Sequence, residues 1–254
     1  MIIKSMMSRK VVTVRRFESV KNSVKKMAQK SISCLVVAEK KMPIGIFTKR
    51  DLLGMLDYGM DLNKTKIDAV MRTPVMPIDE NDTFLSAARR MGLMDVRRFI
   101  VVDKAGKLSG IVTQTDIIKY FATRSFPYNL TLATIASSGY TATPVTPLKK
   151  IARTMIENRI TCVTVLKNRK PVGLLTEQYL VKLSARAREP IKGRAGERMI
   201  KKFSVVNIEQ SMRESVLRMI KDGSRNLVLV DDGGRYAGVV EQKELVAYIE
   251  KSQH

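Results

Sequence analysis

Methionine recurs in this chain at a fixed interval of 64 residues, at Met27, Met91, Met155 and Met219. A glycine followed by two apolar residues recurs with almost the same period, at Gly45, Gly110, Gly173 and Gly238. Four similar units of about 64 residues therefore fill almost the whole chain of 254 residues. A unit of this size exposes an apolar sheet and is only marginally stable alone, so we expect the units to pair.

Each unit repeats the same order of hydrophobic patterns. A short extended stretch, such as VVTV at 11–14, precedes a helix of 3.6-residue periodicity, in which Val20, Val24 and Met27 share one face. A near-continuous apolar strand, a polar turn, a second strand with the repeated glycine and a last helix follow. The predicted unit is β-α-β-β-α, which makes the chain an α/β protein. The recurring methionine is expected to fill the core beneath the first helix.

The end of each unit carries a more specific motif. It reads GIFTKRDL at residues 45–52 and GIVTQTDI at residues 110–117. This G-h-h-T-x-x-D-h ending, where h is hydrophobic, together with the unit length and element order, resembles the CBS domain, named after cystathionine beta-synthase. The resemblance covers residues 5–250 as four repeats and implies two pseudo-twofold pairs, often called Bateman modules. Pair 1 would span 1–128, with repeats at about 1–60 and 65–125, and pair 2 would span 129–254, with repeats at about 130–187 and 194–254.

Pairs of CBS repeats are mostly regulatory sensors of adenosine-containing ligands, which bind between the two repeats. The resemblance therefore implies AMP, ADP or ATP as a regulatory ligand, with S-adenosylmethionine less favoured, and no prosthetic group. It also implies that Thr48 and Thr113 face phosphate and that Asp51 and Asp116 hold ribose. A hydroxyl beside free helix N–H groups suits phosphate, and a carboxylate accepts hydrogen bonds from both ribose hydroxyls. The T-x-x-D spacing equally fits a helix capping box, and both readings are compatible in an empty site.

In the family, each cleft takes residues from both repeats of a pair. The resemblance implies that Val12 and Ile32 of the first repeat cover the base in the cleft of Asp116. Met76 and Val96 of the second repeat would do the same in the cleft of the first motif.

Basic residues cluster near the same clefts. Arg97 and Arg98 fall where some family members bind phosphate, and Lys49 and Arg50 lie inside the first motif. Arginine suits phosphate through its planar fork of donors, although each of these side chains could also be a solvated surface charge. Their clustering favours a phosphorylated ligand over the cationic sulfonium of S-adenosylmethionine.

The third and fourth units depart from the motif. GLLTEQYL keeps Thr176 but has Tyr179 in place of the acid, and GVVEQKEL has Glu241 and Glu244 in place of threonine and aspartate. A carboxylate at the helix start is expected to cap the helix and to repel a phosphate. We therefore expect the second pair to lack the usual paired sites, so that it is structural, binds something else or docks a partner.

Composition excludes several classes of function. The single histidine is the last residue, and the two cysteines, Cys34 and Cys162, start the apolar strand of equivalent units, where we expect small core residues. Histidine catalysis, a metal cluster, a disulfide framework and the common phosphate-binding loops are therefore not expected. No apolar run is long enough for a membrane helix or a secretory signal, so a cytoplasmic protein without membrane contact is expected.

The net charge of +22 permits nucleic acid as a partner. The most basic stretch is 182–202, KLSARAREPIKGRAGERMIKK, whose basic residues are Lys182, Arg186, Arg188, Lys192, Arg194, Arg198, Lys201 and Lys202. A mobile basic loop could follow a phosphate backbone, but aromatic residues for base stacking are missing from this stretch. Nucleic-acid binding is therefore the alternative function, and a solvated linker is the plainer interpretation.

These observations favour a non-catalytic regulatory binder of adenine nucleotides. Its regulated protein partner would be a separate chain, because the sequence shows no effector domain. CBS modules commonly pack face to face into a flat disc. Two modules in one chain could complete the disc alone, or a homodimer could share it, and the sequence does not decide between these.

Overall fold

Four small sheets, each of three strands, carry the fold. The computed structural model describes residues 1–122, 126, 129–186 and 189–252, and all statements below concern these residues. In every sheet the short first strand runs parallel to the central strand and the third strand runs antiparallel to it. The predicted α/β fold of four β-α-β-β-α repeats is confirmed.

The strands are β1 (Thr13–Val14), β2 (Cys34–Glu39), β3 (Met42–Thr48), β4 (Ile78–Asp79), β5 (Arg98–Val102), β6 (Leu108–Thr113), β7 (Thr141–Ala142), β8 (Cys162–Lys167), β9 (Lys170–Thr176), β10 (Val205–Asn207), β11 (Asn226–Val230) and β12 (Tyr236–Glu241). The α-helices are α1 (Val20–Gln29), α2 (Lys49–Asp57), α3 (Phe84–Leu93), α4 (Gln114–Ala122), α5 (Leu148–Glu157), α6 (Glu177–Arg186), α7 (Ala195–Arg198), α8 (Met212–Asp222) and α9 (Gln242–Ser252). Three 3-10 turns complete the described elements: η1 (Ile3–Ser5), η2 (Ile67–Ala69) and η3 (Leu132–Thr134).

The first long helix of each repeat buries the face that its periodicity predicts. In α1, Val20, Val24 and Met27 are fully buried, and Ser19 caps the helix by accepting a hydrogen bond from the Asn22 amide. All four periodic methionines have exposed fractions of 1% or less, which confirms them as core residues. Cys162 is buried as expected, whereas Cys34 is only half-buried.

A short segment at the start of each repeat packs on the other repeat of its pair. The Ile3 amide of η1 donates to the Asp82 carbonyl of repeat 2, and the Ile67 amide of η2 donates to the Glu18 carbonyl of repeat 1. The second pair repeats this exchange, with η3 bridged to repeat 4 and α7 to repeat 3. The two repeats of a pair are therefore interlocked. The predicted boundary between the pairs, at residues 128 and 129, adjoins residues 127 and 128, which lie outside the described part of the chain.

The exchanged segments explain the periodic glycine. A Cβ on Gly110 would lie 2.5 Å from the sulfur of Met7, which follows η1. Gly45 and Gly173 face Met71 and Met199 in the same way. A side chain at these positions would push the crossing segment off the sheet.

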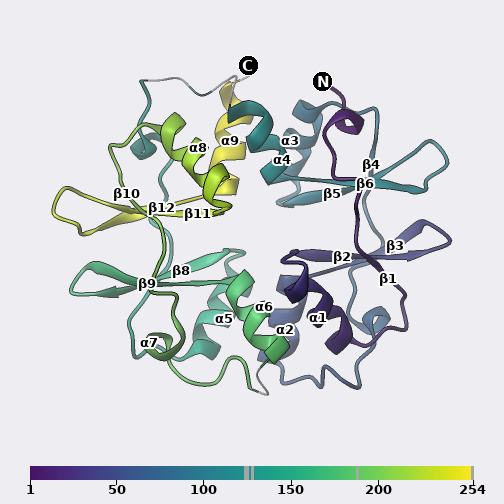
Figure 1. The fold of residues 1–254 in the computed structure, drawn as a ribbon, viewed down its shortest axis with the longest axis horizontal. Coiled ribbons are helices and arrows are strands. Elements are labelled where there is room, and N and C mark those ends of the chain that lie inside the picture. The colour runs from purple at the N-terminus through teal and green to yellow at the C-terminus, as the bar shows by residue number, and fades with distance from the viewer. Residues whose placement is uncertain (123–125, 127–128, 187–188, 253–254) are drawn as a thin grey trace.

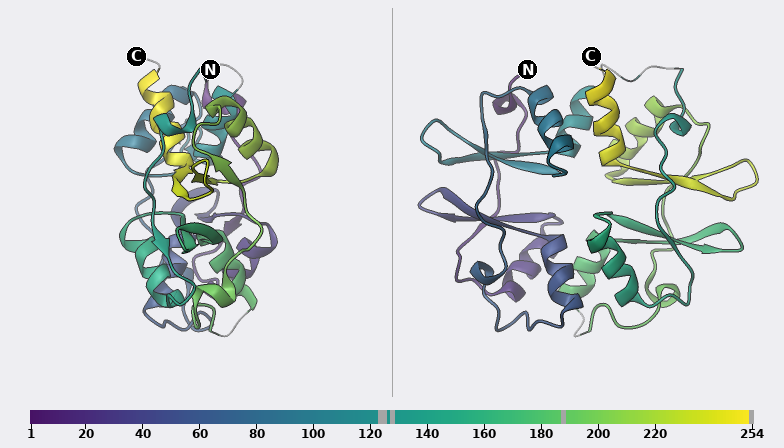
Figure 2. Two further views of the ribbon diagram at one scale, coloured as in Figure 1. Left: turned by 90° about the vertical axis from the view of Figure 1, so that its left-hand side faces the viewer. Right: turned by 180° about the vertical axis from the view of Figure 1, so that it is seen from behind.

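The four repeats occupy the corners of a flat molecule, with the helices toward the middle and the β-hairpins at the outer edges (Figure 1). Seen after a turn of 90° about the vertical axis, the molecule is narrower than in Figure 1 (Figure 2, left). Helices of repeats 1 and 3 contact one another in α2–α5, α1–α6 and α2–α6, and repeats 2 and 4 meet through α3–α9, α4–α9 and α4–α8. One chain thus forms the disc in this structure. None of the described helices combines the length and hydrophobicity that crossing a membrane requires.

Candidate functional site

Both predicted aspartates form capping boxes at the starts of their helices. Asp51 Oδ2 accepts hydrogen bonds from the Thr48 amide at 2.8 Å and from the Thr48 hydroxyl at 2.6 Å. Asp116 Oδ2 binds the Thr113 amide at 2.8 Å and hydroxyl at 2.7 Å in the same way. The remaining oxygen of Asp51 accepts from Arg72 Nε at 2.7 Å. Helix capping therefore explains why threonine and aspartate occur at this spacing. The role of the two motifs in ligand binding stays a prediction.

A cleft of about 140 Å³ lies beside the first motif. Four of the predicted residues line it: Thr48, Val96, Arg97 and Arg98. Asp51 is not among the residues that line the cleft, and its side chain is 9% exposed. The side chain of Met76 is 58% exposed, and Met76 is not among the residues lining this cleft.

The residues predicted for the second cleft lie on both repeats of the pair. Val12 and Ile32 are half-buried and pack on the core of repeat 1. Thr113 lines a larger cavity of about 360 Å³ in the middle of the molecule. By strand register, Ser8 opposite Ile111 takes the place that Arg72 has opposite Ile46. The arginine that holds Asp51 thus has a serine as its counterpart on the Asp116 side.

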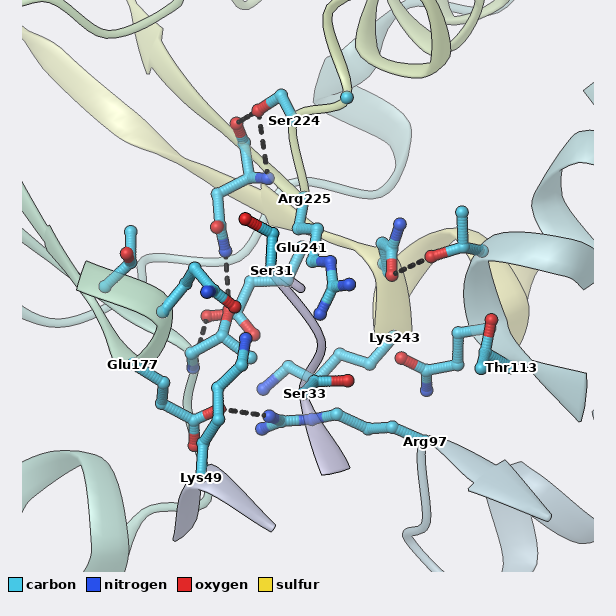
Figure 3. A pocket seen from close by; sticks show the side chains of 18 of the residues that line it. Ser31, Ser33, Lys49, Arg97, Thr113, Glu177, Ser224, Arg225, Glu241 and Lys243 are labelled. Atoms are coloured by element: carbon cyan, nitrogen blue, oxygen red, sulfur yellow. Dashed lines mark hydrogen bonds and ion pairs between the residues drawn. The ribbon is translucent and has the colours of Figure 1, made fainter. Parts of the chain in front are cut away.

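The central cavity receives side chains from all four repeats (Figure 3). It shares Ser33, Lys49, Arg97, Arg98 and Glu177 with the smaller cleft, so the two spaces adjoin. Its volume lies within the range of about 300–1,000 Å³ that is usual for small-molecule sites. The cleft and the cavity together offer an extended space that begins at the first T-x-x-D motif.

Positive charge dominates the central cavity. Its lining holds six basic residues, Lys49, Arg97, Arg98, Lys182, Arg225 and Lys243, against the two acidic residues Glu177 and Glu241. Such a cluster of partly buried cations favours a bound anion.

Lys49 has a strongly lowered pKa in this cavity. The residue is 4% exposed, and burial lowers its pKa to about 7, with Arg225 adding to the effect and Glu177 opposing it. Burial also lowers the pKa of Arg225, and Arg98 lowers it further. Anionic oxygens near these groups would reverse the shifts.

Several buried polar atoms of the cluster lack a hydrogen-bond partner among the described residues. They are Arg50 Nε, Arg98 Nε, Glu177 Oε1 and Glu241 Oε2. Buried polar groups normally form hydrogen bonds, so two arginine Nε donors without one indicate room for an acceptor.

The sequence did not single out Lys182, Arg225, Glu177 or Lys243 as site residues. An alignment of the four repeats would have suggested Arg225, because Ser33, Arg97, Thr161 and Arg225 each precede the central strand at the same register. Glu177 reaches the site only because the two pairs pack together, so aligning the repeats would not have identified it.

In the fourth repeat a carboxylate caps the helix, as expected. Glu244 Oε2 accepts from the Glu241 amide at 2.9 Å, so Glu244 is the capping carboxylate of α9. Glu241 instead points into repeat 3, where Oε1 accepts from the Thr161 amide at 3.1 Å and from Cys162 Sγ at 3.6 Å. Burial and the neighbouring Glu241 raise the pKa of the Cys162 thiol. Among the described residues no cluster of histidine, cysteine and carboxylate side chains could hold a metal ion.

The basic stretch 182–202 is partly structured. It contains the end of α6 and all of α7, and Pro190 and Ala195 are buried. Its described basic side chains are all exposed, and Arg188 lies outside the described residues. Only part of this stretch is therefore loop, as Pro190, Gly193 and Gly196 lead us to expect.

The family model described as the CBS domain matches the chain four times, at residues 3–58, 67–123, 133–186 and 195–251. Among solved structures, the chain is similar to protein MJ1225 of Methanocaldococcus jannaschii, with a TM-score of 0.89 and 19% identity over 98% of this chain and 100% of that one. MJ1225 is proposed to be an archaeal homologue of γ-AMPK. At this identity the similarity shows the fold alone.

Two curated relatives match shorter parts of the sequence. The uncharacterized protein MK0525 of Methanopyrus kandleri is 34% identical over 113 residues, which are 44% of this chain and 58% of that protein. The gamma subunit of the 5′-AMP-activated protein kinase of Kluyveromyces lactis is 33% identical over 92 residues, 34% of this chain and 28% of the subunit. These matches thus span little more than half of the first relative and under a third of the second.

Proposed function

The chain belongs to the CBS domain family, and we propose that it is a non-catalytic regulatory protein that binds an adenine nucleotide in its first pair of repeats. The observation that carries this proposal is the continuity between the Thr48 cleft and the cation-rich central cavity. A base and ribose would lie in the cleft, and the phosphates would point to the centre. Asp51, and Asp116 on the other side of the pair, would bind ribose hydroxyls while still capping their helices.

The charge of the cavity supports AMP, ADP or ATP over S-adenosylmethionine. Arg97, Arg98 and Arg225 offer guanidinium donors to the central cavity, and Lys49 adds an ammonium group. Planar guanidinium groups bind phosphate oxygens in pairs, whereas a sulfonium ion would add to the positive charge. We therefore favour a ligand with at least one phosphoryl group.

The regulatory part of the proposal concerns a separate protein. The kinase gamma subunit among the relatives belongs, by its name, to an enzyme that 5′-AMP activates. By analogy, a nucleotide bound to this chain would change how a partner chain is engaged. A ligand present at a hundred times its Kd stabilises the state that binds it by about 2.7 kcal/mol, which is enough to shift such an equilibrium.

Nucleic-acid binding is the second candidate. The exposed basic side chains described between residues 182 and 202 are the observation that supports it. Binding of this kind weakens steeply with salt because it releases counterions. An oligonucleotide that binds at low salt and still binds the Asp51 and Asp116 variants would favour this candidate.

Calorimetric titration with AMP, ADP, ATP and S-adenosylmethionine tests the leading proposal. Asp51→Asn and Asp116→Asn keep a capping side chain but remove the carboxylate charge, so each should weaken binding in its own cleft. Losing charge-assisted hydrogen bonds, worth about 1.5–3 kcal/mol each, should reduce affinity by at least about tenfold. Glu244→Gln is the matched control, because Glu244 caps α9 in the same way but lies in repeat 4. Equal affinity of parent, Asp51→Asn and Asp116→Asn for every ligand would exclude the proposed sites.

A further inference from the structure

Glu177 reaches from the second pair into the proposed phosphate site of the first. It is the first residue of α6, and its side chain is 6% exposed. Its Oε2 accepts from Arg97 Nη1 at 2.8 Å, and its Oε1 lies 3.7 Å from Arg50 Nε (Figure 3 shows the Arg97 contact). The equivalent residues of the other repeats are Lys49, Gln114 and Gln242, so the acid is specific to repeat 3.

The same two arginines also bind a main-chain oxygen of repeat 3. Arg97 Nη2 donates to the Arg159 carbonyl at 2.7 Å, and Arg50 Nη2 donates to it at 2.9 Å. Glu177 and this carbonyl together give the two guanidinium groups the set of oxygen acceptors that a phosphoryl group would give them. The second pair thus fills an anion position that belongs to the first pair.

The three acidic residues that line the cleft and the cavity, Asp95, Glu177 and Glu241, carry too little negative charge for the eight basic residues there. Besides Arg97 and Arg50, the cavities that Glu177 lines hold Lys49, Arg98 and Arg225, and Glu177 raises the pKa of Lys49 against the lowering effect of burial. Arg50 Nε and Arg98 Nε have no hydrogen-bond partner among the described residues. A ligand with several negative charges would match this cluster better than Glu177 does.

The volume of the cleft leads to the same conclusion. At about 140 Å³ the cleft beside Thr48 is smaller than the roughly 300 Å³ at which small-molecule sites usually begin. Glu177 lines both this cleft and the central cavity. A phosphoryl group next to Arg97 would meet the Glu177 carboxylate at short range, where two anions repel. Entry of the ligand therefore requires Glu177 to withdraw.

We propose that Glu177 is an internal competitor for the phosphoryl group of a ligand in the Thr48 cleft, and that ligand entry breaks the ion pair between the two pairs of repeats. The proposal rests on the proposed function for its nucleotide, but the competition itself needs only an anion. It makes Glu177 a residue that sets ligand affinity from the opposite half of the molecule. Filling the cleft would then change the contact between the halves.

Calorimetry of the full chain with ATP, inorganic pyrophosphate and adenosine tests the competition. Glu177→Gln keeps the size of the side chain and an acceptor for Arg97 but removes the charge. We expect ATP and pyrophosphate to bind about tenfold more tightly to this variant, a typical coupling between two sites, and adenosine to bind as it does to the parent. The control is Glu157→Gln, which changes the net charge equally at an exposed position on α5 of the same repeat.

Each outcome decides the question. Unchanged or weaker binding of both anions to Glu177→Gln overturns the inference, and so does the absence of any anion binding to parent and variant. A further outcome is that Glu177→Gln binds pyrophosphate more tightly while Asp51→Asn leaves the affinity for ATP unchanged. This combination supports the competition but excludes the proposed nucleotide site. If Glu177→Gln fails to fold, Glu177→Asp, whose carboxylate is one methylene shorter, should still gain about twofold to threefold.

Discussion

At the scale of single residues, Lys49 is the group whose charge depends most on the ligand. Its pKa of about 7 results first from burial and then from the charges around it, where Arg225, Arg98 and Arg97 lower the value and Glu177 raises it. A phosphate beside the ammonium group would favour the charged form. Ligand binding should therefore take up a proton at pH values above 7.

We predict that the affinity for ATP falls by up to about tenfold per pH unit between pH 7 and pH 9, because the free protein must then acquire the proton on Lys49. Calorimetry in two buffers of different ionisation enthalpy measures the proton uptake directly. Lys49→Met should bind more weakly at pH 7 and lose most of the slope. A parent affinity that stays level across this range would contradict the assignment.

The same shift predicts the pH dependence of stability. Below pH 7 Lys49 is charged in both the folded and the unfolded state, and burial of the charge opposes folding. Above pH 7 only the unfolded state, with a pKa near 10.5, still holds the proton. This contribution therefore makes the unliganded protein more stable as the pH rises from about 7 to about 10.

Part of this residue-level site could be predicted from sequence. Thr48, Arg97 and Arg98 line the cleft because they occupy fixed places in the repeat, and repeats can be aligned by eye. Glu177 was missed because its partner Arg97 is 80 residues away in the other pair. The sequence does not show which of Glu241 and Glu244 caps α9, because both carboxylates lie at the same helix start.

At the scale of elements, the exchanged segments are what bind two repeats into one unit. Their helical turns are short, such as Ile67–Ala69 in η2, and they bury few side chains each. Periodicity identified the long helices and central strands but gave no signal for three-residue turns. A sequence boundary between repeats therefore does not coincide with the boundary of their cores.

We predict that Ile67→Ala destabilises repeat 1 although Ile67 belongs to repeat 2 in sequence. The side chain is fully buried in the core of repeat 1, so its truncation should cost roughly 2–5 kcal/mol. Hydrogen exchange measured by mass spectrometry should show the larger loss of protection in β2 and β3. Leu93→Ala, at a position that is 75% exposed, is the control and should change little. Loss confined to β5 and β6 would contradict the exchange of segments.

At the scale of the whole molecule, the two pairs share hydrophobic cores as well as charges. Leu53 of repeat 1 belongs to the core of repeat 3, and Val181 of repeat 3 belongs to the core of repeat 1. Repeats 2 and 4 form one continuous core. Arg153 of repeat 3 and Asp57 of repeat 1 add an ion pair between these two repeats, at 3.2 Å. Movement at the central cavity is therefore resisted by packing on both sides of it.

This sharing predicts that one substitution at the junction affects both halves. Leu53→Asp would place a carboxylate without a partner in a fully buried position and remove an apolar side chain, at a cost of about 4 kcal/mol. We expect the unfolding midpoint to fall by several degrees and the radius of gyration in solution scattering to increase as repeats 1 and 3 separate. Leu217→Asp introduces the same charge on α8 at a position that is 41% exposed, and should leave both quantities nearly unchanged. If Leu53→Asp behaved like Leu217→Asp, the halves would be held by the α3–α9 side alone. Entry of a ligand at Arg97 could then separate repeats 1 and 3 without disturbing either core.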